Sequence, residues 1–337
     1  MSNEKISFNG QLITPLTIID GNTLMTQDFE PLQFAIEKIL PHGLFIIAGS
    51  PKVGKSWLAL DLCQAVATGG KLWDFYAVQG DVLYLALEDT YNRLQNRLNQ
   101  MEAESRDISQ LHLSVASFGL YDGLLEQIHH FINENINTNF IIIDTLGHIR
   151  NGEQDKNMYA CDYRDMNRLR EITNKHKITL LLVHHTRKMY DPDPLNTISG
   201  STGLIGAVDG VFVLEKSKRT GNDAKLTIAN RDTEGFCFNL RFDNEKRRWA
   251  FVGNNSDGND EEDILCVLLD DFLQDEWNGT ATELCTALKK QDDSIDLNPA
   301  TLSKYLKAKQ GLLHNNYNIS LNFERTRNSK RIFLKRA

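Results

Sequence analysis

Residues 44–56 read LFIIAGSPKVGKS, an apolar run that leads directly into the pattern GxxxxGK[ST]. Gly49 and Gly54 let the backbone curl so that successive N–H groups can face one phosphate group. Residues 57–67, WLALDLCQAVA, then predict a helix, which Gly69 and Gly70 are expected to end. A strand, a glycine-rich loop and a helix in this order predict a P-loop, with the phosphate at the helix N-terminus.

The P-loop pattern gives individual side chains their expected roles. Lys55 is expected to reach the β- and γ-phosphates, and the Ser56 hydroxyl to coordinate Mg²⁺. The sequence therefore predicts ATP and Mg²⁺ as cofactors. The residues expected to bind the nucleotide are Gly49, Ser50, Pro51, Lys52, Val53, Gly54, Lys55, Ser56 and Trp57.

Apolar runs such as DVLYLAL, FIIID and ITLLLV alternate with amphipathic stretches in the first two thirds of the chain. Parallel strands need crossover helices, so this alternation predicts a mostly parallel sheet covered on both faces. After Asp209 the runs VFVLEK, KLTIAN, FNLRF and RWAF are separated by polar turns, which predicts antiparallel hairpins that extend the sheet. The expected fold class is α/β, a P-loop NTPase core with a mostly parallel sheet and an antiparallel extension.

Two acidic residues at strand ends are candidates for catalysis. Asp144 ends the run FIIID, where a Walker B carboxylate would hold Mg²⁺ through water. Glu88 follows the run VLYLAL, and at the end of a strand beside the P-loop strand it can orient and deprotonate the attacking water. This arrangement resembles that of RecA-like ATPases. Glu88 could instead be a solvated acid or a helix cap.

A further apolar run, at residues 178–183, leads into His184 and His185. Sites in parallel sheets lie at the carboxyl ends of the strands, so a polar side chain there can sense the γ-phosphate. We assign this sensor role to His185. Either histidine could instead be a hydrogen-bonded structural residue.

These motifs, in order, resemble those of the RepA-type branch of RecA-like ATPases, found in plasmids, phages and other mobile elements. The resemblance covers roughly Ile39–Phe251 and rests on GSPKVGKSWLALDL, VLYLALED, FIIIDTLGHIR, LLVHHTRK and GSTGLIGAVDGVFVL. It implies a ring-shaped hexameric helicase, with Lys55 and Ser56 on ATP and Mg²⁺, Glu88 as catalytic base, Asp144 as Walker B acid and His185 as sensor.

The same resemblance implies that a neighbouring subunit contributes a cation to the γ-phosphate. Arg231 stands at the end of the late strand LTIAN and is the best candidate for this arginine finger. Arg231 could equally pair with Asp232 or Glu234 in a surface hairpin.

The net charge of −8 conceals an asymmetry. Residues 297–337 carry nine Lys and Arg against one acid, a balance of +8, which leaves −16 for residues 1–296. A basic end on an acidic body is expected when one module contacts phosphates and the other does not. GNNSDGND, residues 253–260, lacks apolar periodicity, so the expected domains are an N-terminal arm (1–30), the RecA-like domain (31–252), a linker (253–261) and a basic C-terminal domain (262–337).

Three helices and a basic hairpin are predicted in the C-terminal domain. An apolar-periodic helix (263–274) precedes a capping box at Thr280–Glu283 and a third helix that starts at Asn298-Pro299; strands 319–324 and 330–335 follow. This is a winged-helix plan, and it resembles the module that often follows such ATPase cores. The residues expected to contact nucleic acid are Lys304, Lys307, Arg325, Arg327, Lys330 and Arg331. A protein-binding surface or a solvated charged face would also fit.

The leading hypothesis is a DNA-associated, Mg-ATP-hydrolysing motor, an oligomer that acts as a replicative helicase of a mobile element. The core is expected to prefer single-stranded DNA, and the winged module duplex DNA. The alternatives are an ATP-dependent DNA-binding switch (an initiator, loader or regulator) and a RecA-like recombination or repair factor. No apolar run approaches the roughly 18 residues of a membrane span, and the five cysteines show no metal or disulfide spacing, so a cytoplasmic protein is expected.

Overall fold

The computed structural model describes residues 6–8, 11–13, 16–101, 107–150, 157–187, 191, 193–216, 221–254, 264–291, 298–325 and 330–336. The chain divides into two compact units, Met1–Leu32 and Gln33–Ala337. In the first, β1 (Ile6–Phe8) pairs with β2 (Gln11–Ile13), and α1 (Gly21–Thr26) follows with Asp20 as its N-cap. No residue of α1 is buried.

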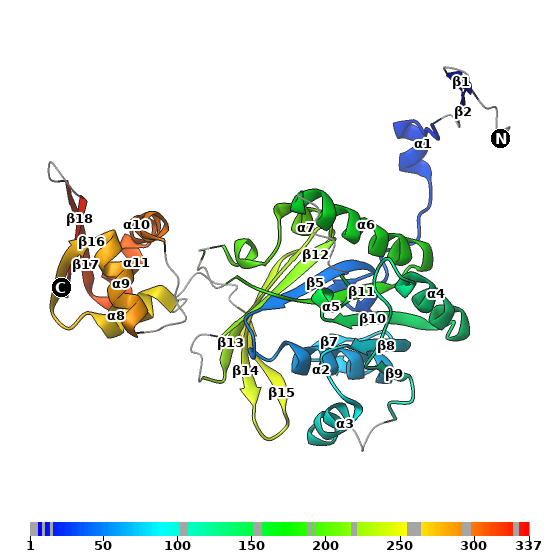
Figure 1. Ribbon diagram of the computed structural model, residues 1–337, viewed down its shortest axis with the longest axis horizontal. Coiled ribbons are helices and arrows are strands. Elements are labelled where there is room, and N and C mark those ends of the chain that lie inside the picture. The colour runs from blue at the N-terminus through cyan, green and yellow to red at the C-terminus, as the bar shows by residue number, and fades with distance from the viewer. Residues whose placement is uncertain are drawn as a thin grey trace. The chain divides into compact units, whose positions relative to one another are not determined.

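A nine-stranded sheet organises the second unit (Figure 1). Six neighbouring strands run parallel, and three antiparallel strands extend the sheet at one edge, which confirms the predicted α/β fold class. In spatial order the strands are β15 (Arg248–Asn254), β14 (Phe236–Asp243), β13 (Asp223–Asn230), β12 (Gly210–Lys216), β5 (Gly43–Gly49), β11 (Thr179–His185), β10 (Thr138–Asp144), β8 (Asp81–Ala86) and β9 (Leu111–Ser114).

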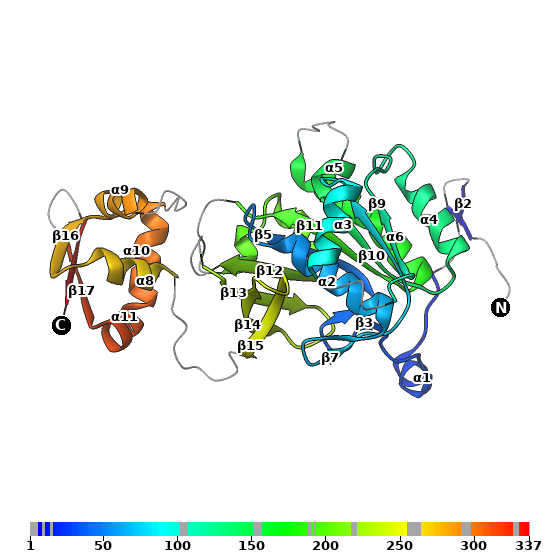
Figure 2. The same cartoon turned by 90° about the horizontal axis from the view of Figure 1, so that it is seen from below.

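Helices cover both faces of this sheet, as the two views in Figures 1 and 2 show. Strands β5 and β10 are buried along their whole length because apolar side chains point to both faces. One core packs α2 and α3 on the sheet, and the other packs α4, α6 and α7. The helices are α2 (Lys55–Thr68), α3 (Tyr91–Gln100), α4 (Leu124–Glu134), α5 (Leu146–Ile149), α6 (Met158–His176) and α7 (Thr202–Gly206).

Short elements complete the second unit's core. Gly69, at φ 63°, ends α2 as predicted, because the left-handed conformation costs glycine little. A short 3-10 helix spans Pro194–Thr197. Two small hairpins pair β3 (Phe34–Ile36) with β4 (Leu40–Pro41) and β6 (Lys71–Leu72) with β7 (Phe75–Tyr76).

The C-terminal module has its own apolar core, formed by residues such as Leu269, Leu302 and Ile332. The predicted capping box is present, with Thr280 N–H donating to Glu283 and Glu283 N–H donating to the Thr280 hydroxyl. The elements are α8 (Ile264–Phe272), β16 (Glu276–Thr280), α9 (Ala281–Gln291), α10 (Pro299–Ala308), α11 (Gln310–Tyr317), β17 (Ile319–Arg325) and β18 (Lys330–Arg336).

The module has one strand and one helix more than the sequence pattern predicted. Its sheet has three strands in the order β16-β18-β17, so β16 pairs with the expected hairpin, and α11 is a fourth helix. β15 continues through Asn254, two residues into the segment expected as the linker. Residues 255–261, the rest of that segment, lie outside the described residues.

Candidate nucleotide site

The predicted P-loop connects β5 to α2 at the carboxyl edge of the parallel strands. Gly54 caps α2 with φ 110°, a conformation that favours glycine, and a Cβ there would lie 2.9 Å from the Trp249 ring. A Cβ on Gly49 would lie 2.6 Å from the carbonyl oxygen of Leu214. Both glycines are therefore required by close backbone and ring contacts, and the α2 N-terminus opens where a phosphate would sit.

Lys55 crosses this loop and is almost fully buried. Its Nζ donates to the carbonyl oxygens of Gly49 (2.7 Å) and Ser50 (3.0 Å). Burial lowers the pKa of Lys55 to about 8, against the opposing charges of Asp144 and Glu88. A phosphate oxygen would offer this buried ammonium group a charged partner in place of two neutral carbonyl oxygens.

Two oxygen donors for a cation meet beside Lys55. The Ser56 hydroxyl donates to Asp144 Oδ2 at 2.8 Å, and Asp144 ends β10 with 5% of its surface exposed. Burial raises the pKa of Asp144, and hydrogen bonds from Tyr84 and Ser56 oppose this shift. A hydroxyl and a carboxylate at hydrogen-bond distance are the hard oxygen ligands that Mg²⁺ prefers, so these residues fit the predicted cation.

Glu88 follows β8 in a turn and lies at the same edge of the sheet. Its Oε1 accepts a hydrogen bond from the Thr145 hydroxyl at 2.9 Å, and His148 Nδ1 is 3.5 Å away. The expectation that its strand lies beside the P-loop strand is wrong. β11 and β10 separate β8 from β5, because the strand order is not the chain order.

The two histidines at the end of β11 differ in their surroundings. His185 Nδ1 lies 3.4 Å from Lys55 Nζ, and burial and the Lys55 charge lower its pKa. His184 Nε2 instead contacts the Ser199 carbonyl oxygen at 3.0 Å, and burial lowers its pKa to about 4. His185 therefore adjoins the P-loop, whereas His184 is held in the structure on the other side of the strand.

Arg231 lies away from these residues. β13 runs antiparallel to β12, and the pair Gly210–Asn230 is level with Phe45 near the start of β5. Arg231 is thus at the amino edge of the parallel strands, opposite the P-loop of its own chain. Its Nη1 lies 3.6 Å from Asp209 Oδ1, a partner other than Asp232 or Glu234, and its side chain is half exposed.

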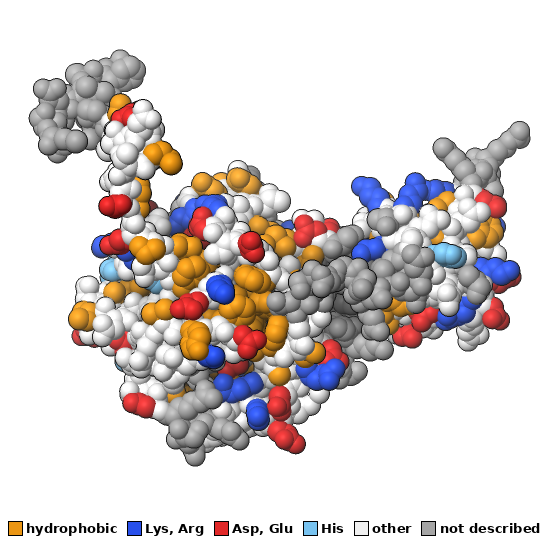
Figure 3. Space-filling model, turned by 180° about the vertical axis from the view of Figure 1, so that it is seen from behind, with side chains coloured by type: hydrophobic (Ala, Val, Ile, Leu, Met, Phe, Trp, Pro, Cys, Tyr) orange, Lys and Arg blue, Asp and Glu red, His pale blue; other side chains and the backbone are white. Residues whose placement is uncertain are grey.

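Some of the predicted nucleic-acid residues lie together on the C-terminal module. Lys307 Nζ on α10 and Lys330 Nζ on β18 lie 5.8 Å and 4.7 Å from the centre of the Phe323 ring. Lys304 and Arg331 are exposed, and Lys and Arg side chains are prominent on this module in Figure 3. Nothing is described of the Arg325 side chain, and Arg327 lies outside the described residues.

Several residues of the site were not identified from the sequence. Tyr84 donates to Asp144, Thr145 and His148 adjoin Glu88, and Trp249 Nε1 donates to the Gly54 carbonyl oxygen. Trp57, expected at the nucleotide, packs edge to face on Phe242. Only Thr145 had a local signal, since it directly follows the Walker B acid.

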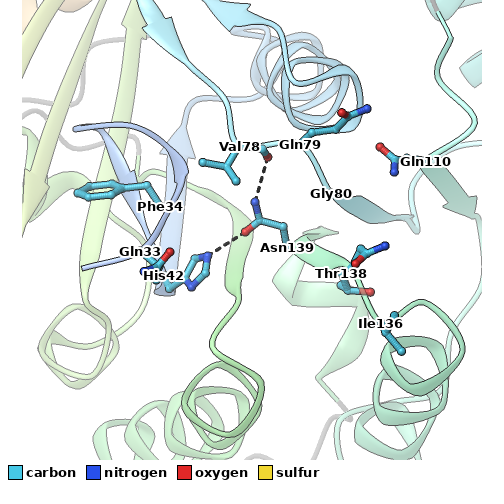
Figure 4. Close-up of a pocket in the computed structure, with 11 residues that line it drawn as sticks. Gln33, Phe34, His42, Val78, Gln79, Gly80, Gln110, Ile136, Thr138 and Asn139 are labelled. Carbon is cyan, nitrogen blue, oxygen red and sulfur yellow. Dashed lines mark hydrogen bonds between the residues drawn. The ribbon is translucent and has the colours of Figure 1, made fainter. Parts of the chain in front are cut away.

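A separate hollow of about 320 Å³ lies at the opposite, amino edge of β8 and β10 (Figure 4). Five of its eleven lining residues are Asn or Gln, and His42 Nε2 contacts Asn139 Oδ1 at 2.8 Å. None of the residues predicted to bind ATP lines it. The nucleotide site is therefore identified by its donor set and not by this hollow.

Comparison with known proteins gives one family match and similar solved structures. The AAA domain model AAA_25 matches residues 16–191. A solved structure whose title describes an ATPase domain is 14% identical, with a TM-score of 0.50 over 63% of this chain and 85% of that chain. A KaiC-like protein from Pyrococcus horikoshii OT3 is 15% identical, with a TM-score of 0.48 over 65% of this chain and 94% of that one.

No curated protein matches the sequence. Within the part of the chain that the structure describes, no helix is long and apolar enough to cross a membrane. The family match covers more than half of the chain, and the fold is that of a RecA-like P-loop ATPase. The chain belongs to the AAA domain family AAA_25.

Proposed function

We propose that this protein hydrolyses Mg-ATP as a DNA-associated, RecA-like motor, a replicative helicase of the RepA type in a mobile element. The observation that carries this proposal is the meeting of Lys55, Ser56, Glu88, Asp144 and His185 at one edge of the sheet, although they come from four separate stretches of the chain. A nucleotide switch needs the phosphate and cation ligands. A hydrolase also needs a base, and Glu88 supplies one.

The proposed chemistry follows from these positions. Lys55 and Ser56 would hold the β- and γ-phosphates and Mg²⁺, which neutralises charge on the transferred phosphoryl group. Glu88 would orient a water molecule and accept its proton, with Thr145 holding one carboxylate oxygen. His185, next to Lys55, would register the γ-phosphate and pass its presence to the segment that follows β11.

An oligomer is part of the proposal. Arg231 is on the edge opposite its own P-loop, so it can complete only the site of another copy. The described residues of the N-terminal unit include seven large apolar side chains that the unit itself leaves exposed, and in the proposed oligomer a second copy covers them. They are Leu16, Ile18, Ile19, Leu24, Met25, Phe29 and Leu32.

DNA contact is proposed for the C-terminal module. Lys307 and Lys330 flank Phe323, and an aromatic ring between two cations can contact a sugar or base while the ammonium groups hold phosphates. The helix α10 would enter a groove and the β17–β18 hairpin would contact the backbone, as in a winged helix.

The test is ATP hydrolysis with Mg²⁺, measured with and without single-stranded DNA. We expect DNA to stimulate hydrolysis, and Lys55→Ala to abolish both the basal and the stimulated rate. A strand-displacement assay then tests unwinding. Hydrolysis that DNA does not change would contradict the motor and favour the ATP-dependent switch, and strand exchange without unwinding would favour the recombination factor.

A further inference from the structure

Tyr84 is a phenol inside an apolar core. It stands in the middle of β8, it is fully buried, and its register partner on β10 is Ile142. Asp144 lies two residues after Ile142 and so shares this face of the sheet. The Tyr84 hydroxyl reaches the carboxylate and donates to Oδ2 at 2.8 Å.

This hydrogen bond has one direction. Burial raises the pKa of Tyr84 well above its ordinary value, and the nearby Asp144 charge adds to the shift. Independently of this shift, an ionised carboxylate oxygen can only accept, so the hydroxyl keeps its proton and donates a hydrogen bond to Oδ2. A neutral donor to a buried anion makes a strong hydrogen bond, and its loss leaves the anion short of a partner.

The Ser56 hydroxyl donates to the same oxygen of Asp144, also at 2.8 Å. Ser56 is the P-loop residue expected to bind Mg²⁺ when a nucleotide is present. Its oxygen would bind the metal through a lone pair, and its proton could still donate to Asp144. Tyr84 would not touch the metal, so holding Oδ2 would be its one role at this site.

We propose that Tyr84 is a positioning residue that fixes one oxygen of the Asp144 carboxylate and so presents the other for magnesium binding through water. This inference rests on the Mg-nucleotide site of the proposed function, but it does not require hydrolysis, DNA binding or an oligomer. Partners that orient metal-binding carboxylates are worth about 10- to 100-fold in metal affinity.

The experiment is a Mg²⁺ titration of the full chain with a fluorescent, non-hydrolysable ATP analogue. In Tyr84→Phe, which keeps the ring, we expect the Mg²⁺ concentration for half-maximal signal to rise by about 10-fold or more. The affinity for the analogue in EDTA is expected to stay at the wild-type value. In a separate assay with ATP itself, Tyr84→Phe should regain most of the wild-type hydrolysis rate at saturating Mg²⁺.

The matched control is Tyr305→Phe, which removes the hydroxyl of another buried tyrosine, one that contacts Cys266 in the C-terminal module. It should titrate as the wild type does. A wild-type Mg²⁺ dependence in Tyr84→Phe would overturn the inference, and so would an equal loss of affinity with and without Mg²⁺, which signals damage to the fold. A wild-type chain that binds no Mg-nucleotide would instead refute the proposed function.

Discussion

The P-loop edge of the large sheet and the C-terminal module hold their polar residues in different ways. At the P-loop edge, Lys55, Ser56 and Asp144 are buried or partly buried and hydrogen-bonded to the protein. On the module, Lys304, Lys307 and Lys330 are exposed, and the contacts of Lys307 and Lys330 with Phe323 are through a ring face. Pre-organised groups suit one small ligand and a reaction, whereas exposed surface cations suit a long polyanion.

The largest effect is expected at the pre-organised edge. Glu88→Gln removes the proposed base but keeps a side chain that can accept the Thr145 hydrogen bond. The turnover number should fall by about 100- to 10,000-fold, the usual contribution of a general base, while ATP affinity changes little. Single-turnover kinetics measures the chemical step directly. Glu126→Gln, on α4, is the control, and a Glu88→Gln turnover within about threefold of wild type would contradict the role of Glu88.

Removing the C-terminal module should separate DNA binding from ATP hydrolysis. Deleting residues 262–337 should weaken DNA binding and flatten its dependence on salt, because the basic residues release counterions from DNA. Basal ATP hydrolysis should remain, since the core has its own apolar clusters. Fluorescence anisotropy at several salt concentrations measures the first effect. Unchanged DNA affinity in the truncated chain would assign DNA binding to the core.

The burial of His184 should make the stability of the fold depend on pH. His184 has a pKa of about 4 in the folded chain against 6.5 in the unfolded chain, so the unfolded state binds the proton first as pH falls. Its contribution is complete above pH 6.5 and is lost progressively toward pH 4, by about 3 kcal/mol.

Denaturant unfolding at several pH values tests this shift. His184→Gln keeps an N–H for the Ser199 carbonyl oxygen and cannot take up a proton, so its stability should fall less steeply over the same range. If plots of unfolding free energy against pH are parallel for the variant and the wild type, His184 is not the group that causes the loss of stability.

The smallest effects are expected on the module. Lys307→Ala and Lys330→Ala should each weaken DNA binding several-fold and lower the slope of log affinity against log salt by about one. Lys71→Ala is a matched control, because Lys71 is an exposed residue outside the module that also lies over an aromatic ring, that of Tyr76. If all three variants behave alike, the lysines on the module are only a solvated surface.

Sequence reasoning worked where the signal was local. The P-loop, the strand that ends at Asp144 and the capping box at Thr280 are defined by residues a few positions apart, and their geometry follows from that spacing. The sheet order is not local. The pattern therefore placed Glu88 at a strand end correctly but put its strand beside β5, where β11 lies.

Tyr84, β16 and α11 were not predicted for the same reason: each depends on contacts between residues that are distant in the sequence. In the run VLYLAL, Tyr84 is one more large core residue, and only the register of β8 with β10 brings its hydroxyl to Asp144. The sequence EWNGT gave no strand signal for β16, which forms because β18 supplies an edge. Gly311 and the asparagines of QGLLHNNY disfavour a helix, yet Leu313 packs in the module core and α11 forms.

The placement of Arg231 and the P-loop on opposite edges of one sheet bears on the symmetry of any assembly in which Arg231 serves a second copy. A contact from one edge to the other joins two different surfaces head to tail, and its repetition gives either a closed ring or an open filament. Two chains joined in this way contain one complete site and one incomplete site. The rate of ATP hydrolysis per subunit should then rise with protein concentration. A chain that lacks Arg231 should inactivate the site of only one of its two neighbours.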